Sequence, residues 1–527
     1  MVLSVPKTER NLPMKKIFAI LMTICLLAGA LSITAFAAEE TYKSKDELPA
    51  PAEGTVIRVT AIKGDEIVLV GDYTNFEDGW FNAIHEGLPA QTKKTKYERI
   101  IVDFYADWTS ADDGNFTDDP AMQLNSEGFN NDTIEIPDDV KITVNLGGHT
   151  IKRVLPDSIT DGEVMYIDED ADVIINNGTI TGGKSTNGAG GIHIHDAHVT
   201  LNNVHIVGNV ADNDDGGGIA LYDDAVLVMN GGSFRDNSID GVVGNELFDC
   251  YGGAIYIEDS TATFNGVEFK NNQNTNDEDY GAAIYANNSK VYLYECTFDG
   301  NGIEDESQNT CGTTSIVHAE DSDLVMKKVT FVNNGSYYDD DYIGRIYASS
   351  NLLSSLIVLD DSTFTLSGDS KFTNNATVFA ISVYDDSHLY VENTTFENNK
   401  SFVMYSRGEH YDDSYFKNCT FENNKVPDAE NLFKEIDDDW IYTFAVDEEV
   451  LTFIDCKMSD STYYDRDNMK FTDADAANGA ASIFGEGSLT MIVAFVALIV
   501  SVAAIIVNVS SKKNKVAAPK NAEEDDE

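Results

Sequence analysis

The stretch Gly252–Asn272 reads GGAIYIEDSTATFNGVEFKNN and contains three short runs in which apolar and polar residues alternate. The residues that share one face of each run are Ile255 and Ile257, then Ala262 and Phe264, then Val267 and Phe269. Alternation with a period of two predicts strands with one buried face. Turn-forming residues, Glu-Asp-Ser and Asn-Gly, separate the runs. The stretch therefore predicts three strands that make one rung of a coil.

The last part of this stretch, Phe-x-x-Asn, recurs along the chain. It is found at Phe234–Asn237, Phe269–Asn272, Phe298–Asn301, Phe331–Asn334, Phe372–Asn375, Phe396–Asn399 and Phe421–Asn424, with Ile206–Asn209 as an aliphatic variant. Successive Asn residues lie 24 to 41 residues apart. Self-similarity at this spacing predicts a stacked solenoid. We expect the Phe residues to point inward and the Asn residues to form a ladder that satisfies backbone groups at a corner of each rung.

The combination of Gly-Gly-Ala-Ile (Gly252–Ile255) with Phe-x-x-Asn resembles the repeat of the chlamydial polymorphic outer-membrane proteins. More broadly, it resembles bacterial surface proteins of the right-handed parallel β-helix class. The resemblance covers roughly Val140–Met458, and the Gly-rich half is looser in the other rungs. It implies an all-β, right-handed parallel β-helix and a surface or adhesin-like role. Nothing at the C-terminus reads as the outer-membrane barrel of the chlamydial proteins.

Acidic residues dominate the charge. The chain has 90 Asp and Glu against 35 Lys and Arg, a net charge of −55. Such a surface repels nucleic acid, anionic lipid headgroups and polyuronates, and it attracts cations. An apolar fraction of 42%, with 24 Tyr and 26 Phe, argues against a disordered chain.

Two apolar segments predict secretion and anchoring. Lysines at 15 and 16, the apolar run Ile17–Ile33 and Ala35-Phe36-Ala37 have the three parts of a signal peptide, with cleavage after Ala37. Leu489–Val509 is uncharged and is followed by three lysines, which predicts a single membrane-spanning helix with its C-terminal side in the cytoplasm. A retained N-terminal anchor is the alternative to a cleaved signal.

The domain boundaries follow from these segments. We predict a signal peptide (1–37), a spacer (38–53), an N-terminal capping region (54–153), the β-helix (154–467), a linker (468–488), the membrane helix (489–509) and a cytoplasmic tail (510–527). In the capping region, a hairpin around Lys63-Gly64-Asp65 precedes an amphipathic helix over Asn75–Glu86, and a strand follows at Ile100–Phe104. We expect this α/β unit to cover the open end of the first rung; a separate ligand-binding domain is the alternative.

Acidic pairs recur after the first strand of many rungs. They are Asp223-Asp224, Glu258-Asp259, Glu320-Asp321, Asp360-Asp361, Asp385-Asp386 and Asp412-Asp413. A catalytic pair of carboxylates is needed once, whereas a turn is needed in every rung, so repetition favours structural turns. Stacked carboxylates nevertheless repel one another, and divalent cations relieve that repulsion.

Two acidic runs add further candidate ligands for a cation. We expect Ca²⁺ as a cofactor, bound either at the column of acidic pairs or at one of these runs. The candidate ligands are Asp212, Asp214 and Asp215 in the first run and Asp339, Asp340 and Asp341 in the second. Neither run has EF-hand spacing.

Histidines and cysteines offer weaker candidates. His193 and His195 alternate with isoleucines and so face outward together, but no third metal ligand is evident. Cys296, Cys419 and Cys456 occupy a place that holds Val in other rungs, which predicts core packing. Cys250 and Cys311 lie in Gly-rich loops two rungs apart, beyond the reach of a disulfide unless the loops bend.

The sequence thus predicts a membrane-anchored cell-surface β-helix protein without catalytic activity, adhesin-like or a scaffold for contact with a glycan or a host protein. The alternative is a surface polysaccharide hydrolase or lyase, which needs one cleft where a unique carboxylate pair, or an Arg beside Ca²⁺, breaks the repeat. A third possibility is a structural spacer. The expected partners are the membrane and an extracellular glycan or cell-surface protein, and not nucleic acid.

Overall fold

The structure is a computed structural model. It describes residues 41–87, 96–110, 129–130, 133–154, 162–186, 188–240, 242–243, 246–247, 250–274, 280–302, 315–335, 355–407, 413–424, 444–446, 451–458 and 469–472. The predicted signal peptide (1–37) and membrane helix (489–509) lie outside these residues, as do Asp339, Asp340, Asp341 and Cys311. Within the described ranges, no helix is long and apolar enough to span a membrane.

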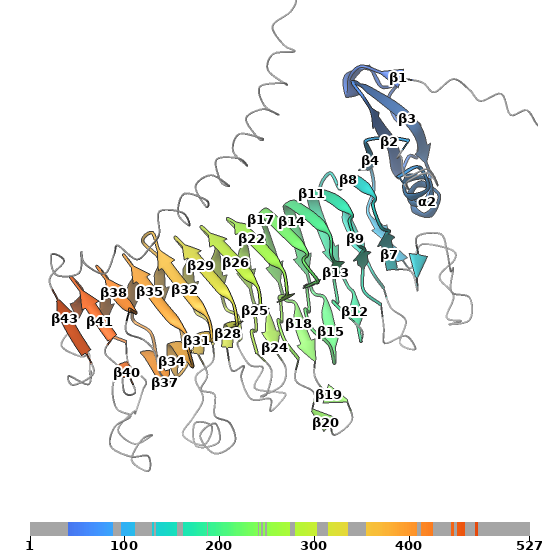
Figure 1. Cartoon of the computed structure of the whole chain (residues 1–527). Coiled ribbons are helices and arrows are strands. Elements are labelled where there is room, and N and C mark those ends of the chain that lie inside the picture. The colour runs from blue at the N-terminus through green and yellow to red at the C-terminus, as the bar shows by residue number, and fades with distance from the viewer. Residues whose placement is uncertain are drawn as a thin grey trace, which may run out of the picture.

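Stacked columns of short parallel strands form the body of the protein (Figure 1). The first column is a twelve-stranded sheet, in which every strand pairs in parallel except β6, which is antiparallel to β7. Its strands are β6 (Phe129–Asn130), β7 (Thr133–Ile136), β10 (Met165–Ile167), β13 (Ile192–His195), β16 (Ile219–Tyr222), β21 (Ile255–Glu258), β25 (Ile284–Asn287), β28 (Ser315–Glu320), β31 (Ser355–Asp360), β34 (Phe379–Tyr384), β37 (Phe402–Arg407) and β40 (Phe444–Val446).

The second and third columns belong to one 25-stranded sheet. The second contains β8 (Lys141–Asn145), β11 (Asp172–Thr181), β14 (His198–Val207), β17 (Val226–Arg235), β22 (Thr261–Asn265), β26 (Lys290–Tyr294), β29 (Asp323–Lys327), β32 (Thr363–Ser367), β35 (His388–Glu392), β38 (Tyr415–Lys417), β41 (Leu451–Ile454) and β43 (Met469–Thr472). The third contains β9 (Thr150–Lys152), the C-terminal halves of β11, β14 and β17, and then β23 (Glu268–Lys270), β27 (Thr297–Asp299), β30 (Thr330–Val332), β33 (Lys371–Thr373), β36 (Thr395–Glu397), β39 (Thr420–Glu422) and β42 (Lys457–Met458).

Two small sheets lie beside the columns. A four-stranded sheet contains β12 (Lys184–Ser185), β15 (Val210–Asp212), β18 (Ser238–Asp240) and β24 (Gln273–Asn274). The strands β19 (Val242–Val243) and β20 (Glu246–Leu247) pair in antiparallel fashion.

The predicted inward column of aromatic rings is confirmed. Phe234, Phe269, Phe298, Phe331, Phe372, Phe396 and Phe421 pair in register through the third column. Neighbouring rings stack with centroids 4.3 to 5.4 Å apart. These side chains are at most 1% exposed. Each rung therefore buries one ring against the next, and the core grows along the solenoid axis.

The predicted asparagine ladder is also confirmed. From Asn209 to Asn399, each Asn donates from Nδ2 to Oδ1 of the Asn in the next rung, at 2.8 to 3.1 Å. The same Nδ2 donates to a backbone carbonyl, as Asn301 does to Phe269 at 2.9 Å. Because all of these amides are buried, the ladder pairs polar groups that would otherwise lack partners.

The acidic pairs serve as turns, as predicted. The second residue of four pairs, Asp224, Asp259, Asp321 and Asp361, has φ between 46° and 61°. Asp and Asn adopt this left-handed conformation more readily than other non-glycine residues because their short side chains bond to nearby backbone.

A serine ladder, which was not predicted, follows these turns. The backbone N–H groups of Ser260, Ser289 and Ser322 each donate to Oγ of the serine in the next rung at 3.0 Å, and Ser362 accepts the last of these bonds. The serines are at most 5% exposed. They therefore point into the corner of the rung and do not act as solvated turn residues.

The N-terminal strands join the solenoid through β4 (Arg99–Phe104). The strands β2 (Ile57–Lys63) and β3 (Glu66–Tyr73) form the predicted hairpin. The short strand β1 (Thr41–Tyr42) pairs antiparallel with β3, and the 3-10 helix η1 (Lys45–Glu47) follows β1 in the chain. β4 pairs antiparallel to β2 and parallel to β8, so one sheet runs from the hairpin into the solenoid. β5 (Trp108–Thr109) pairs parallel to β9 and so also joins the solenoid.

Helix α2 (Phe76–Gly87) lies against the first strands of the solenoid. Its buried face includes Phe76 and Trp80, and the Phe76 ring lies 4.5 Å from that of Trp108. The Trp80 indole donates a hydrogen bond to the carbonyl of Glu135 in β7, at 3.2 Å. The side-chain Oδ1 of Asn75 accepts a hydrogen bond from the backbone N–H of Asp78 at 2.8 Å and so caps the N-terminus of the helix.

Candidate functional site

Aromatic side chains gather on the outward face of the twelve-stranded sheet. In the parallel register, Tyr166 of β10 pairs with His193 of β13, and Tyr256 of β21 pairs with Tyr285 of β25, which pairs with His318 of β28. Each follows an inward aliphatic residue and so points away from the core. Ala220 of β16 interrupts this register position between His193 and Tyr256.

Tyr222, two residues after Ala220, fills the interruption. Its ring lies 5.0 Å from His193 and 5.5 Å from Tyr256. The other contacts are 4.8 Å between Tyr166 and His193, 5.6 Å between Tyr256 and Tyr285, and 5.1 Å between Tyr285 and His318. These six residues, Tyr166, His193, Tyr222, Tyr256, Tyr285 and His318, are called the aromatic column below.

Two further tyrosines cover the middle of the column. Tyr251 and Tyr280 immediately precede the glycines at 252 and 281, and they pair with each other in an isolated parallel bridge. The Tyr251 ring stacks on Tyr285 at 4.4 Å, and the Tyr280 ring meets His318 edge-on at 5.0 Å. Tyr256 and Tyr285 are consequently only 6% and 4% exposed, whereas Tyr222, Tyr251 and Tyr280 remain partly exposed.

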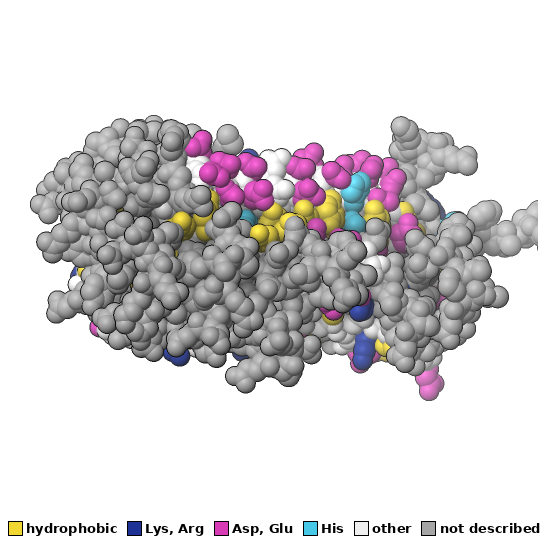
Figure 2. Space-filling view, turned by 90° about the horizontal axis from the view of Figure 1, so that it is seen from below, with side chains coloured by type: hydrophobic (Ala, Val, Ile, Leu, Met, Phe, Trp, Pro, Cys, Tyr) yellow, Lys and Arg dark blue, Asp and Glu magenta, His cyan; other side chains and the backbone are white. Residues whose placement is uncertain are grey.

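Carboxylates flank the aromatic column. The strands end, in register, at Glu258, Asn287, Glu320 and Asp360. The Tyr285 hydroxyl donates to Oε2 of Glu320 at 2.5 Å, and Asp223 lies 2.9 Å from Nε2 of His195. Figure 2 shows this face from below, with apolar side chains in a row and acidic side chains along one side of them. The face therefore offers flat aromatic surface beside hydrogen-bond acceptors.

Asp215 is a strongly perturbed carboxyl group of this face. Burial raises its pKa to about 7, and the Asp214 and Glu258 carboxylates act in the same direction. The backbone N–H of Tyr251 donates to its Oδ1 at 2.7 Å, which opposes the shift. A carboxyl group in this environment can exchange a proton near neutral pH.

The pKa of Asp215 predicts a pH dependence of stability. Because the folded protein binds this proton more tightly than the unfolded chain, the contribution of Asp215 to stability is most favourable below about pH 4 and falls as the pH rises towards 7. We expect Asp215→Asn to be more stable than the parent by on the order of 2 kcal/mol at pH 7.5 and to differ little at pH 4. Urea denaturation at both pH values measures this, with Asp224→Asn as the control because Asp224 is exposed and is not among the groups that shift Asp215; equal pH dependence of the parent and the Asp215 variant would contradict it.

The predicted cation ligands are engaged in separate contacts. Asp212 Oδ2 pairs with Lys184 Nζ at 2.7 Å, Asp214 Oδ2 accepts the backbone N–H of Gly188 at 2.8 Å, and Asp215 binds the backbone of Tyr251. These bonds tie adjacent Gly-rich loops together. The prediction that this run binds Ca²⁺ remains a prediction, and the second run, 339–341, lies outside the described residues.

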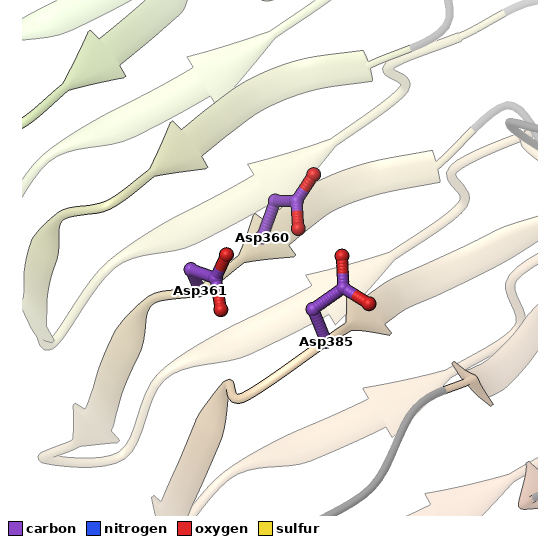
Figure 3. A group of neighbouring side chains, drawn as sticks. All are labelled: Asp360, Asp361 and Asp385. Atoms are coloured by element: carbon purple, nitrogen blue, oxygen red, sulfur yellow. The ribbon is translucent and has the colours of Figure 1, made fainter.

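A different trio of carboxylates converges. Asp360, Asp361 and Asp385 present oxygens that lie within 4.8 Å of one another, and they form the one such group in the described part of the chain (Figure 3). They belong to two successive acidic pairs of the predicted column. Burial raises the pKa of Asp360 to about 6, with Asp385 and Asp361 adding repulsion. The buried Asp360 Oδ1 has no hydrogen-bond partner.

We expect cations to stabilise the fold at this trio. At pH 7.5 and equal ionic strength, millimolar CaCl₂ should raise the melting temperature above that in NaCl, because a divalent ion offsets the repulsion most strongly. Asp385→Asn should raise the melting temperature in NaCl and remove the increment that CaCl₂ gives. The double variant Asp212→Asn with Asp214→Asn tests the run predicted from sequence in the same way. Equal melting temperatures in both salts would show that these carboxylates are solvated surface groups that bind no Ca²⁺.

The predicted positions of the histidines and cysteines agree with the structure. His193 and His195 face outward, next to Glu163 at 3.6 Å and Asp223 at 2.9 Å respectively. Cys296 and Cys419 are 1% exposed in the core, and Cys456 is partly buried. Cys250 packs against Ala211 and Ile239, and Cys311 lies outside the described residues.

Sequence reasoning missed the aromatic column, although a signal for it is present. The residue between the two inward aliphatics of the first strand is aromatic in Ile-Tyr-Ile (255–257), Ile-His-Ile (192–194) and Met-Tyr-Ile (165–167). Superposing the rungs on their Gly-rich halves would have placed these residues in one line. The cover by Tyr251 and Tyr280 comes from loops, and loop paths do not follow from periodicity.

Parallel columns around one apolar core, with aromatic and acidic residues on an outward face, define a parallel β-helix protein. Comparison with family models matches residues 141–303 and 244–432 to the family described as right handed beta helix region. Because these matches span more than half of the chain, the protein belongs to the right-handed β-helix family. No curated protein matches the chain, and no solved structure matches it.

Proposed function

We propose that this protein is a membrane-anchored cell-surface β-helix that binds a glycan along the aromatic column, without catalysis. The observation that carries the proposal is the continuous row of aromatic side chains flanked by carboxylates on an outward face. The resemblance of its repeats to those of chlamydial surface proteins supports an adhesin-like role, with a host or cell-surface molecule as the carrier of the glycan.

The chemistry of the face selects the class of glycan. Sugar rings present apolar C–H faces that pack on aromatic rings, and their hydroxyl groups donate to carboxylates. The partly exposed rings of Tyr222, Tyr251 and Tyr280 supply such surface, with Glu258 and Glu320 beside them. A net charge of −55 repels polyuronates, so the ligand is a neutral or amino-bearing glycan.

The binding test uses the full chain purified in detergent and an array of neutral, amino-bearing and uronate glycans. We expect binding in the first two classes and a loss of at least about tenfold in affinity for Tyr222→Ala or Tyr251→Ala, since removal of one stacking ring removes a central contact. Tyr292→Ala is the matched control, because Tyr292 is a partly buried tyrosine on β26, in the other sheet. No glycan bound, or equal loss in all three variants, would refute the proposal.

The anchoring part is tested by topology. Protease added to intact cells should remove the repeats and leave a short C-terminal stub, because Leu489–Val509 would hold that end in the membrane. Recovery of the repeats as a free protein in the medium, without a cleavage step, would contradict the anchor.

A polysaccharide hydrolase is the second candidate, and one observation favours it. Burial raises the pKa of Asp215 to about 7, which suits a proton donor, and Glu258, one of the charges that raise this pKa, is a second carboxyl group close to it, as hydrolysis by a carboxyl pair requires. Release of reducing ends from a bound glycan, abolished by Asp215→Asn while binding persists, would establish hydrolysis. Binding without release of reducing ends would establish the non-catalytic function.

A further inference from the structure

Cys419 and Cys456 occupy the same position in two successive rungs. Residues on both sides pair in register: Lys417 with Ile454 before the turn, and Thr420 with Lys457 after it. Backbone bonds of 2.8 Å close the turn on both sides, from Asn418 N–H to the carbonyl of Ile454 and from Lys457 N–H to the carbonyl of Cys419. The two cysteines are therefore direct neighbours across one strand spacing.

The local backbone points the two thiols in the same direction. The preceding residues, Asn418 and Asp455, have φ of 52° and 53°, so the two turns share one conformation. Neighbouring strands lie about 4.8 Å apart, and disulfides join Cα atoms about 4.4 to 6.8 Å apart. The two thiols make matching contacts: Cys419 Sγ donates to the carbonyl of Lys417 at 3.4 Å, and Cys456 Sγ donates to the carbonyl of Ile454, the register partner of Lys417, at 3.5 Å. Because the Cβ atoms of a disulfide lie about 3.5 to 4.5 Å apart, side chains at the usual strand spacing need to approach by roughly 0.3 to 1.3 Å.

We propose that a disulfide joins Cys419 to Cys456 in the mature protein and fastens the C-terminal rungs of the solenoid to each other. The inference rests on the extracellular location in the proposed function, because disulfides persist outside the cytoplasm. The bond would close the chain between the two cysteines, residues 420–455, which connects β39 to β42. It would thereby hold the end of the coil, where β38 pairs with β41 and β39 pairs with β42.

The reaction is a thiol–disulfide exchange with a protein or glutathione disulfide as oxidant. The thiolate of Cys456 attacks the disulfide of the oxidant and releases one thiol; the thiolate of Cys419 then attacks the mixed disulfide and releases the second. Two thiols lose two protons and two electrons, and the oxidant is reduced to two thiols. Cys456 reacts first because it is the more exposed of the two, and its contact with Cys419 lowers its pKa.

Peptide mapping tests the pairing. The full chain isolated from cells is alkylated under denaturing conditions, digested and analysed by mass spectrometry before and after reduction. We expect one linked peptide pair containing Cys419 and Cys456, which separates on reduction, and a melting temperature about 3–5 °C lower after reduction. Alkylation of both cysteines without reduction would overturn the proposal.

Serine variants keep the test independent of folding. The equivalent positions in the two preceding rungs are Ser370 and Thr394, so Cys419→Ser and Cys456→Ser place a hydroxyl that this corner already accommodates. Each variant should lose the linked peptide and the effect of reduction on melting. Cys296→Ser is the control, because Cys296 is buried in the same column several rungs away and should leave the linkage intact.

A second arm separates this inference from the proposed location. The reduced, purified chain is incubated with oxidised glutathione and mapped in the same way. If the pair links here but is reduced in protein from cells, the extracellular location has failed; if it does not link even here, the pairing itself is wrong.

Discussion

Replacing Phe298 by Asp is expected to destabilise the protein by about 4 kcal/mol or more. The ring is fully buried between Phe269 at 4.7 Å and Phe331 at 4.3 Å. Loss of its burial alone amounts to about 2–3 kcal/mol, and an unpaired carboxylate in its place adds a larger desolvation penalty. Because each rung contacts only its neighbours, the substitution should weaken the interfaces on both sides of β27 and favour separation of the solenoid at this rung. Thermal melts and urea denaturation followed by circular dichroism measure the change.

The control introduces the same charge one residue away. Thr297 precedes Phe298 on β27 and points outward, partly exposed. Thr297→Asp should therefore change stability by less than about 1 kcal/mol. Phe396→Asp, farther along the same column, should repeat the result of Phe298→Asp. Unchanged melting of both Phe variants would contradict the inward register of the third column.

Asn301→Ala is expected to destabilise the fold by roughly 3–5 kcal/mol, although no apolar core is lost. The Asn301 amide accepts bonds from the backbone N–H and from Nδ2 of Asn272, and it donates to Phe269 and Asn334. Removing it leaves several buried polar groups without a partner, each at about 1–3 kcal/mol. Equilibrium denaturation gives the change in free energy of unfolding.

An exposed amide beside the ladder provides the comparison. Asn271 has φ of 53°, and its side-chain amide donates to the exposed Asp236. Asn271→Gly keeps this backbone conformation available and removes one exposed bond, so we expect a change below about 1 kcal/mol. If Asn301→Ala changed the free energy of unfolding as little as Asn271→Gly does, water would be able to reach this corner of the rung and satisfy the polar groups that the asparagine ladder pairs.

Repeated short-range patterns determined the fold. Alternation in Gly252–Asn272 defined three strands, and the recurrence of Phe-x-x-Asn required those strands to stack in register. A parallel stack places the same residue type on itself in every rung, so an inward Phe or a corner Asn could be identified from its own repeats. The acidic turns followed for the same reason, because their chemistry is local to the backbone.

Only the tertiary structure decided which residues gather on the surface. Tyr222 contacts both His193 and Tyr256, on either side of the strand that carries Ala220. Tyr251 and Tyr280, which lie before the strands, pack on Tyr285 and His318. The cation ligands predicted from consecutive Asp residues point to separate partners, whereas Asp360, Asp361 and Asp385 meet from two different rungs. The register that places Cys456 next to Cys419 likewise depends on a connection between rungs whose length the repeat does not specify. Periodicity specifies which face of a strand a residue occupies; contacts between rungs depend on loop paths and side-chain rotamers, which one rung of sequence does not contain.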